Sequence, residues 1–81
     1  MTKEMLADYV ECGNEIEFKF NNKMYSITYG IVDEKEVISF CEFYKETTEV
    51  ESFDELIKVS RDGRTVLQMW EFLSEEEVWI Y

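Results

Sequence analysis

Residues 15–29 read Glu-Ile-Glu-Phe-Lys-Phe-Asn-Asn-Lys-Met-Tyr-Ser-Ile-Thr-Tyr, and this stretch decides the fold. Charged and apolar residues alternate over its first six positions, and successive side chains of a strand point to opposite faces. Asn21 and Asn22 follow, and asparagine tolerates the positive φ that a two-residue hairpin turn requires. The pattern predicts a β-hairpin whose opposed residues are Phe20 with Lys23, Phe18 with Tyr25, Ile16 with Ile27, Glu17 with Ser26 and Lys19 with Met24.

Three stretches are predicted to form helices. Residues 2–12 place apolar side chains at helical spacing, and a glycine follows them as a stop signal. Ser52 with Glu55, and Thr65 with Gln68, match the capping box, in which two side chains satisfy free backbone N–H groups reciprocally. We therefore expect helices over residues 2–12, 53–59 and 66–73.

A third strand is predicted over residues 37–44, which are rich in β-branched and aromatic types. The charged residues 33–36 before it predict a solvated turn. The polar residues 45–51 after it predict a turn that includes a short extended piece around Val50. Because the strand is apolar on both faces, it is expected to be central, or to have helices or a partner over its second face. Residues 78–81 fit either a further strand or an extension of the last helix, and we expect the strand.

These elements together predict one domain, residues 1–81, of the α+β class. The hairpin is tight and the next connection is short, so the sheet is expected to be an antiparallel meander. We expect three to four strands with helices packed on one face, in the order α-β-β-β-α-α-(β).

The charge balance limits the classes of partner. The chain has 19 acidic and 8 basic residues, no histidine and a formal net charge of −11. Direct binding to nucleic acid or to an anionic membrane is not expected, because phosphate contacts depend on Lys and Arg. Such a surface suits a larger, basic protein as partner. The alternative is that the acidity only keeps a small protein soluble.

The residues that usually carry chemistry are scarce. Histidine, the commonest acid–base group at neutral pH, is absent. Cys12 and Cys41 are too few for a structural zinc site, no Gly-rich phosphate loop or calcium loop occurs, and we expect no metal and no cofactor. Cys41 is expected in the core, and Glu42 on the solvent face of its strand, with a tuned catalytic carboxylate at Glu42 as the alternative. The inventory predicts a protein that is not an enzyme.

The acidic stretches and surplus aromatics predict a surface for a basic partner, where charges steer the encounter and aromatics anchor it. The concrete form of this hypothesis is an inhibitor or anti-defence factor that occupies a nucleic-acid-binding surface of a larger protein by charge mimicry. A homodimeric structural or small-ligand domain, joined through the third strand or an open sheet face, is the alternative. The candidate partner-binding residues are Tyr44, Glu46, Glu49, Glu51, Glu75, Glu76, Glu77 and Trp79.

Two further expectations concern location and kinship. No signal-peptide pattern and no apolar run of membrane-spanning length occurs, so we expect a cytoplasmic protein with reduced thiols. The segments Tyr25-Ser26-Ile27, Phe53-Asp54-Glu55-Leu56 and Asp62-Gly63-Arg64-Thr65, the last before a Trp-bearing helix, have a characteristic layout. Over residues 15–73 this layout resembles small uncharacterised acidic proteins of Gram-positive bacteria and their mobile elements. The resemblance implies no catalytic residues.

Overall fold

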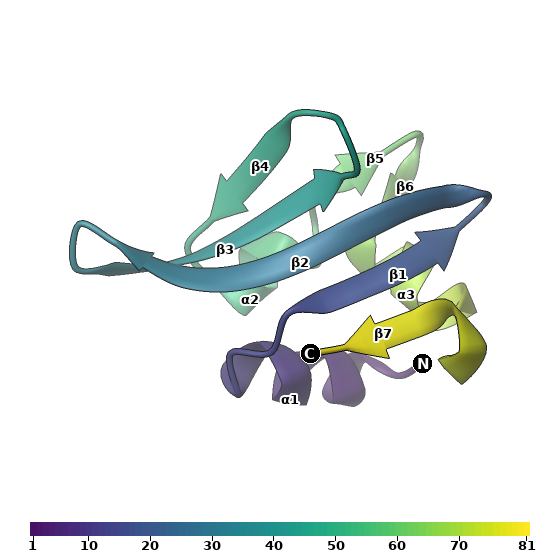
Figure 1. The fold of residues 1–81 in the computed structure, drawn as a ribbon, viewed down its shortest axis with the longest axis horizontal. Coiled ribbons are helices and arrows are strands. Elements are labelled where there is room, and N and C mark those ends of the chain that lie inside the picture. Colours follow the sequence, from purple (N-terminus) through teal and green to yellow (C-terminus); the bar gives the residue numbers. More distant parts are fainter.

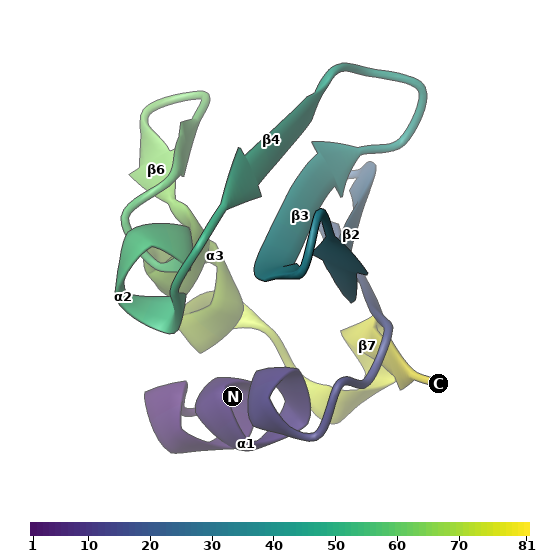
Figure 2. The same cartoon turned by 90° about the vertical axis from the view of Figure 1, so that its left-hand side faces the viewer.

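The computed structural model describes residues 1–81 and consists of a curved five-stranded antiparallel sheet with three α-helices on one side (Figures 1 and 2). The α+β class and the antiparallel arrangement are confirmed. In chain order the elements are α1 (Lys3–Glu11), β1 (Ile16–Phe20), β2 (Lys23–Val32), β3 (Lys35–Glu42), β4 (Thr47–Val50), α2 (Phe53–Leu56), β5 (Ser60–Arg61), β6 (Arg64–Thr65), α3 (Val66–Phe72), the 3₁₀ helix η1 (Glu75–Glu77) and β7 (Val78–Ile80).

The β1–β2 hairpin has the predicted register. Phe18 pairs with Tyr25 and Ile16 with Ile27, and all four side chains are buried on the helix side of the sheet. Asn21 and Asn22 adopt φ values of 54° and 64°, the positive φ at both central positions that the favoured two-residue hairpin turn needs. The alternation of the sequence and its turn residues therefore specify the same pairing.

The second hairpin is longer than the sequence indicates. Residues 33–36 were expected to form a turn, but only Asp33 and Glu34 do so, both with positive φ. Lys35 and Glu36 belong to β3, and β2 continues to Val32. Charged side chains are tolerated in these strands because this end of the hairpin projects beyond the body of the protein (Figure 1).

The sheet has five strands in the order β4-β3-β2-β1-β7, more than the three to four expected. The extra strand is β4, which pairs with β3 through Ile38 and Val50 and buries Val50. The expected tail strand is confirmed as β7, which pairs with β1. Strand β3 lies between β2 and β4, as its two-sided apolar pattern indicates.

The helices begin where the caps predict. The side chain of Thr2 accepts a hydrogen bond from the backbone N–H of Met5, and Thr65 with Gln68 forms a complete capping box. Helix α2 ends at Leu56, three residues earlier than expected, and residues 57–59 form a turn that leads into the small β5–β6 hairpin. None of the helices is long and apolar enough to cross a membrane.

Trp70 lies at the centre of the core between α3 and the sheet. Its side chain is fully buried, and its ring makes an edge contact with Phe18 at 6.2 Å between centroids. Its indole N–H donates to the backbone carbonyl of Thr2 at 2.6 Å, which ties α3 to the start of α1. One side chain therefore joins the N-terminal helix, the C-terminal helix and the hairpin.

The face of the sheet away from the helices carries small polar residues. Ser26 lies opposite Cys41, and Thr28 lies opposite Ser39, all half-buried. The expectation that Cys41 belongs to the core is wrong, because it alternates with Phe40 and points to this outer face. Both cysteines are free.

Replacing Trp70 by Phe is expected to lower the free energy of unfolding by about 2 kcal/mol, because it removes buried volume and the hydrogen bond to Thr2. The matched change at Trp79, which is 41% exposed, is expected to alter it by less than about 0.5 kcal/mol. Urea unfolding followed by far-ultraviolet circular dichroism measures both. Equal losses from the two variants would contradict the central role of Trp70.

Candidate functional site

The predicted partner-binding residues lie at two opposite edges of the sheet and do not form one surface. One group flanks β4, and the other lies in η1 and β7. Because β4 and β7 are the first and last strands of the sheet, the rest of the sheet separates the groups. The β4 group is Tyr44, Glu46, Glu49 and Glu51, and the β7 group is Glu75, Glu76, Glu77 and Trp79.

The β4 group is itself dispersed. Tyr44 is fully exposed at a positive φ in the turn after β3, and Glu46 follows it on the helix side of the turn. Glu49 pairs with Ser39 and therefore points to the outer face of the sheet. Glu51 follows β4 and faces α1 and α2. These residues belong to three different surroundings.

In the β7 group, one carboxylate has a structural role. Glu77 accepts hydrogen bonds from the backbone N–H and the hydroxyl of Ser74, which caps η1. Glu75 and Glu76 are exposed. Trp79 lies opposite Glu17 of β1, whose carboxylate accepts a hydrogen bond from the hydroxyl of Tyr81 at 3.3 Å.

A groove of about 460 Å³ runs between α1, the projecting β2–β3 hairpin and the β4–α2 link. Its floor is apolar and its rim is acidic. The groove contains three exposed carboxylates and no basic side chain. We call it the acidic groove, and its lining residues are Ala7, Val10, Glu11, Tyr29, Glu36, Ile38, Glu51, Ser52 and Phe53.

The acidic groove exists because β2 extends beyond the helices that cover its inner face. Tyr25 and Ile27 are buried under the helices, whereas Tyr29 and Ile31, next in the same alternation, are 36% and 70% exposed. Glu36 lies opposite Ile31 across the hairpin. The apolar inner face therefore continues into solvent with a carboxylate beside it.

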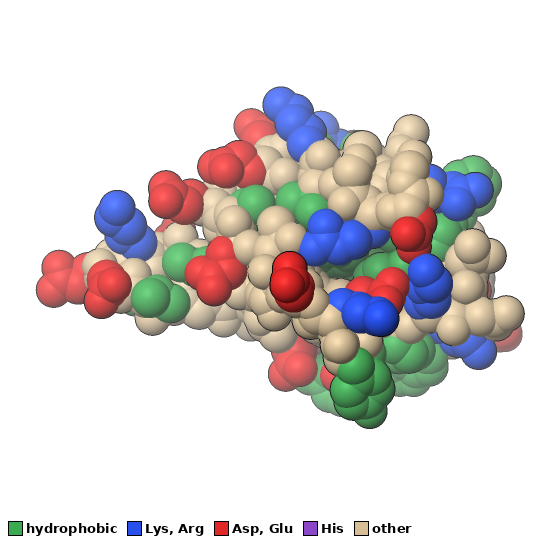
Figure 3. Space-filling view, turned by 90° about the horizontal axis from the view of Figure 1, so that it is seen from above, with side chains coloured by type: hydrophobic (Ala, Val, Ile, Leu, Met, Phe, Trp, Pro, Cys, Tyr) green, Lys and Arg blue, Asp and Glu red, His purple; other side chains and the backbone are tan.

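The carboxylates of the acidic groove have no basic partners. Both ion pairs of the protein involve Lys23, so none of Glu11, Glu36 and Glu51 has a Lys or Arg within 4 Å. A hydrogen bond to the Glu36 carboxylate raises the pKa of the Tyr29 hydroxyl. Acidic side chains gather toward the projecting hairpin, whereas most visible basic ones gather at the opposite end, near the β5–β6 hairpin (Figure 3).

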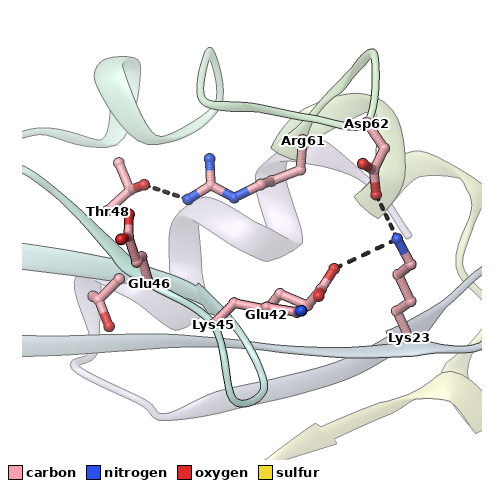
Figure 4. Close-up of a pocket in the computed structure, with 8 residues that line it drawn as sticks. Lys23, Glu42, Lys45, Glu46, Thr48, Arg61 and Asp62 are labelled. Carbon is pink, nitrogen blue, oxygen red and sulfur yellow. Dashed lines mark hydrogen bonds and ion pairs between the residues drawn. The ribbon is translucent and has the colours of Figure 1, made fainter.

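The opposite end holds a second hollow, of about 620 Å³, between the β3–β4 turn and the β5–β6 hairpin (Figure 4). We call it the charged basin. No apolar side chain lines it. Its lining residues are Lys23, Glu42, Lys45, Glu46, Thr47, Thr48, Arg61 and Asp62.

Glu42 lies in the charged basin, so its expected place on the solvent face is wrong. It shares the inner face of β3 with Ile38 and Phe40, at the end of the strand, and its side chain is only 16% exposed. Its carboxylate lies 3.7 Å from the ammonium of Lys23, which provides the partner that a partly buried charge needs.

Lys23 links the sheet to the β5–β6 hairpin. Its ammonium donates to the Asp62 carboxylate at 2.7 Å. That bond and the negative charge of Asp62 raise the pKa of Lys23. The same bond and the positive charge of Lys23 lower the pKa of Asp62. Burial raises the pKa of Tyr25, and the nearby Glu42 carboxylate adds to this shift.

The Cys41 thiol lies beside backbone carbonyl oxygens. The sulfur of Cys41 lies 3.0 Å from the carbonyl oxygen of Glu42 and 3.2 Å from that of Lys45. These are acceptors rather than the positive charge that would stabilise a thiolate. No group of three or more Cys, Asp or Glu side chains is arranged to hold a metal ion.

Sequence reasoning foresaw one member of the acidic groove, Glu51. The signal that was missed is the alternation of residues 25–31, in which Tyr29 and Ile31 continue the inner face of Tyr25 and Ile27. Because β2 extends past Ile31, Tyr29 and Ile31 lie on the core side of the sheet. Tyr29 is thereby brought next to the residues that follow β4.

The chain matches no family model, no curated protein and no solved structure in the three comparisons. The resemblance to small acidic proteins of Gram-positive bacteria stays a prediction.

Replacing Lys23 by Met is expected to destabilise the protein in a pH-dependent way. Because the pKa of Lys23 is raised by folding, Lys23 stabilises the folded state fully below pH 10.5. This stabilisation is lost as the pH rises through the folded-state pKa of Lys23. Because the pKa of Asp62 is lowered by folding, Asp62 stabilises the folded state fully above pH 3.8. This stabilisation is lost as the pH falls through the folded-state pKa of Asp62.

The stability difference between wild type and Lys23→Met is therefore expected to be largest between about pH 5 and 9 and to shrink on both sides. Urea unfolding across the pH range measures it. Lys58→Met is the control, because Lys58 is exposed and has no ion pair. A Lys23→Met difference that stays constant from acid to alkaline pH would contradict the ion-pair account.

Proposed function

We propose that this chain is a non-enzymatic, acidic protein-binding module that takes a basic, partly apolar segment of a larger protein in its acidic groove. The observation that carries the proposal is the combination of an apolar floor with three carboxylates that lack basic partners. In the cell, its place would be the cytoplasm, as an inhibitor or anti-defence factor that covers a nucleic-acid-binding surface by charge mimicry.

The apolar floor of the acidic groove favours partner binding over the alternative that the acidic residues only keep the protein soluble. Acidic residues that only keep a protein soluble need no apolar surface beside them. In the acidic groove, Tyr29 and Phe53 provide area that a partner's aliphatic side chains would cover, and the carboxylates would meet its Lys or Arg groups. A Lys or Arg side chain of the partner fits the apolar floor and the carboxylates together, because its stem is apolar and its head is charged.

A non-enzymatic role is supported by the residues available. The chain has no histidine, and Cys41 lies on the outer face of the sheet, next to backbone carbonyl oxygens. Glu42 is paired with Lys23, which is the arrangement of a structural ion pair. The Ser52 hydroxyl in the acidic groove serves as the cap of α2, where it accepts from the Glu55 backbone N–H and donates to the Glu55 carboxylate.

The triple charge reversal Glu11→Lys, Glu36→Lys and Glu51→Lys is expected to weaken partner binding about tenfold or more, because each reversed charge opposes a basic partner by roughly 0.5 kcal/mol or more. The matched control is Glu71→Lys, Glu75→Lys and Glu76→Lys. These residues are exposed and lie away from the acidic groove, and the change in net charge is the same.

Wild type and both variants are immobilised, and the proteins that each retains from a bacterial lysate are quantified by mass spectrometry along a salt gradient. The expected result is a set of basic proteins retained by wild type and by the control variant but lost by the groove variant. Equal loss in both variants would show that net charge alone determines binding. Equal retention by all three would exclude the acidic groove as the docking site.

A homodimer is the second candidate, and β7 is the element that favours it. The version in which the third strand pairs with itself is wrong, because β3 is hydrogen-bonded on both sides. β7 is an open edge of the sheet, and Trp79, Ile80 and Tyr81 along it are 41%, 36% and 64% exposed. An exposed edge with apolar side chains is a template for pairing with a second copy.

If β7 forms a dimer, sedimentation equilibrium is expected to give twice the chain mass at high concentration, and Ile80→Lys is expected to restore the monomer. Ile31→Lys is the control, because Ile31 is more exposed than Ile80 and lies at the far end of the β2–β3 hairpin. A monomeric mass at every concentration would exclude the dimer.

A further inference from the structure

The charged basin is built from three separate parts of the chain. The β3–β4 turn and the start of β4 form one wall, and the β5–β6 hairpin forms the opposite wall (Figure 4). Lys23 and Glu42, at the end of the sheet, close one side. The side chains of all three parts point into the space between them (Figure 4).

Arg61 is the most constrained side chain in the charged basin. Its guanidinium donates to the hydroxyl of Thr48 and to the carbonyl of Ser60, and it lies over the buried ring of Phe40 at 5.5 Å from the centroid. A guanidinium fixed in this way keeps N–H donors free without losing further side-chain entropy on binding. Arg61 therefore has a defined orientation before any ligand arrives.

Arg61 is also without a carboxylate partner, although the chain has 19 acidic residues. Lys23 pairs with two of the three carboxylates that line the charged basin, Glu42 and Asp62. Three lining charges are left without an ion pair, namely the cations Arg61 and Lys45 and the anion Glu46. Arg61 lies on the β5–β6 wall, and Lys45 and Glu46 lie next to each other on the β3–β4 wall, so the charged basin offers both signs of charge.

We propose that the charged basin is a binding site for a small zwitterion of the α-amino-acid type. The ligand carboxylate forms ion pairs with Arg61 and Lys45, and the ligand ammonium forms an ion pair with Glu46. Arg provides the planar fork that matches a carboxylate, and a charge-assisted pair of this kind is stronger than a neutral hydrogen bond. The site is distinct from the acidic groove, with which it shares no lining residue.

Other ligand classes fit the lining less well. A simple anion would face Glu46 and the field of a protein with a net charge of −11, and a simple cation would face Arg61 and Lys45. An apolar ligand would find no apolar side chain in the lining. A zwitterion meets the opposite charge at each end, and Thr47 and Thr48 add hydroxyl groups for a polar side chain.

The test is a titration of the isotope-labelled protein with L-serine, followed by two-dimensional NMR. The highest concentration is roughly 50 mM, because a few charge-assisted contacts with a small ligand support only millimolar affinity. The expected result is saturable shifts of the backbone amides of residues 45–48 and 60–62. Acetate and methylammonium, which each carry one of the two charges, are expected to bind at least about tenfold more weakly.

Arg61→Gln is expected to weaken L-serine binding about tenfold or more. Arg64→Gln is the matched control, because Arg64 pairs with Arg61 across the β5–β6 hairpin and lies over Phe20 at 5.4 Å, outside the charged basin. Lys45→Gln is a second variant, and Lys45 is an exposed residue whose side chain makes no ion pair.

Absence of shifts at the highest concentration would overturn the proposal, as would equal binding of acetate and L-serine. Unchanged affinity in both Arg61→Gln and Lys45→Gln would also overturn it. Weaker binding in Arg61→Gln and Lys45→Gln, with wild-type binding in Arg64→Gln, would establish the site. Each of these outcomes is independent of whether the acidic groove binds a protein.

Discussion

The shape of the molecule depends on a mismatch of lengths between its two layers. A strand of ten residues, such as β2, spans about 33 Å, whereas a helix of nine residues, such as α1, spans about 14 Å. Helices α2 and α3 are shorter still. The helices therefore cover the middle of the sheet and leave its inner face uncovered at both ends. The acidic groove lies at one uncovered end and the charged basin at the other.

The two ends differ because different side chains continue the inner face of the sheet. At the projecting end, Tyr29 and Ile31 continue it with apolar groups next to Glu36. At the other end, Glu42 continues it with a carboxylate, and Lys23 and Arg61 meet it from neighbouring elements. The same lack of cover thus gives an apolar floor with an acidic rim at one end and a set of mixed charges at the other.

The local parts of this fold could be predicted from the sequence, and the sites could not. The β1–β2 register follows from a two-residue alternation and from Asn21 and Asn22, all within one short segment. Strand β4 was predicted only as a short extended piece around Val50, because residues 47–50 have little apolar pattern and their pairing with β3 depends on tertiary contact. Glu11, Glu36 and Glu51 are distant in sequence, and only the packing of α1 against the hairpin and the β4–α2 link brings them to one groove.

The pairing of β1 with β7 also has a consequence for how the chain folds. Ile16 pairs with Ile80, so β1, the first strand of the predicted hairpin, acquires its second neighbour from a segment more than 60 residues further along the chain. Contacts between distant residues form slowly, because the intervening loop must first be closed. Until then β1 presents a free strand edge, the part of a folding intermediate that is most prone to pair with another chain. The pairing of β7 with β1 is therefore expected late in folding, and the edge of β1 stays open to other chains until β7 has docked.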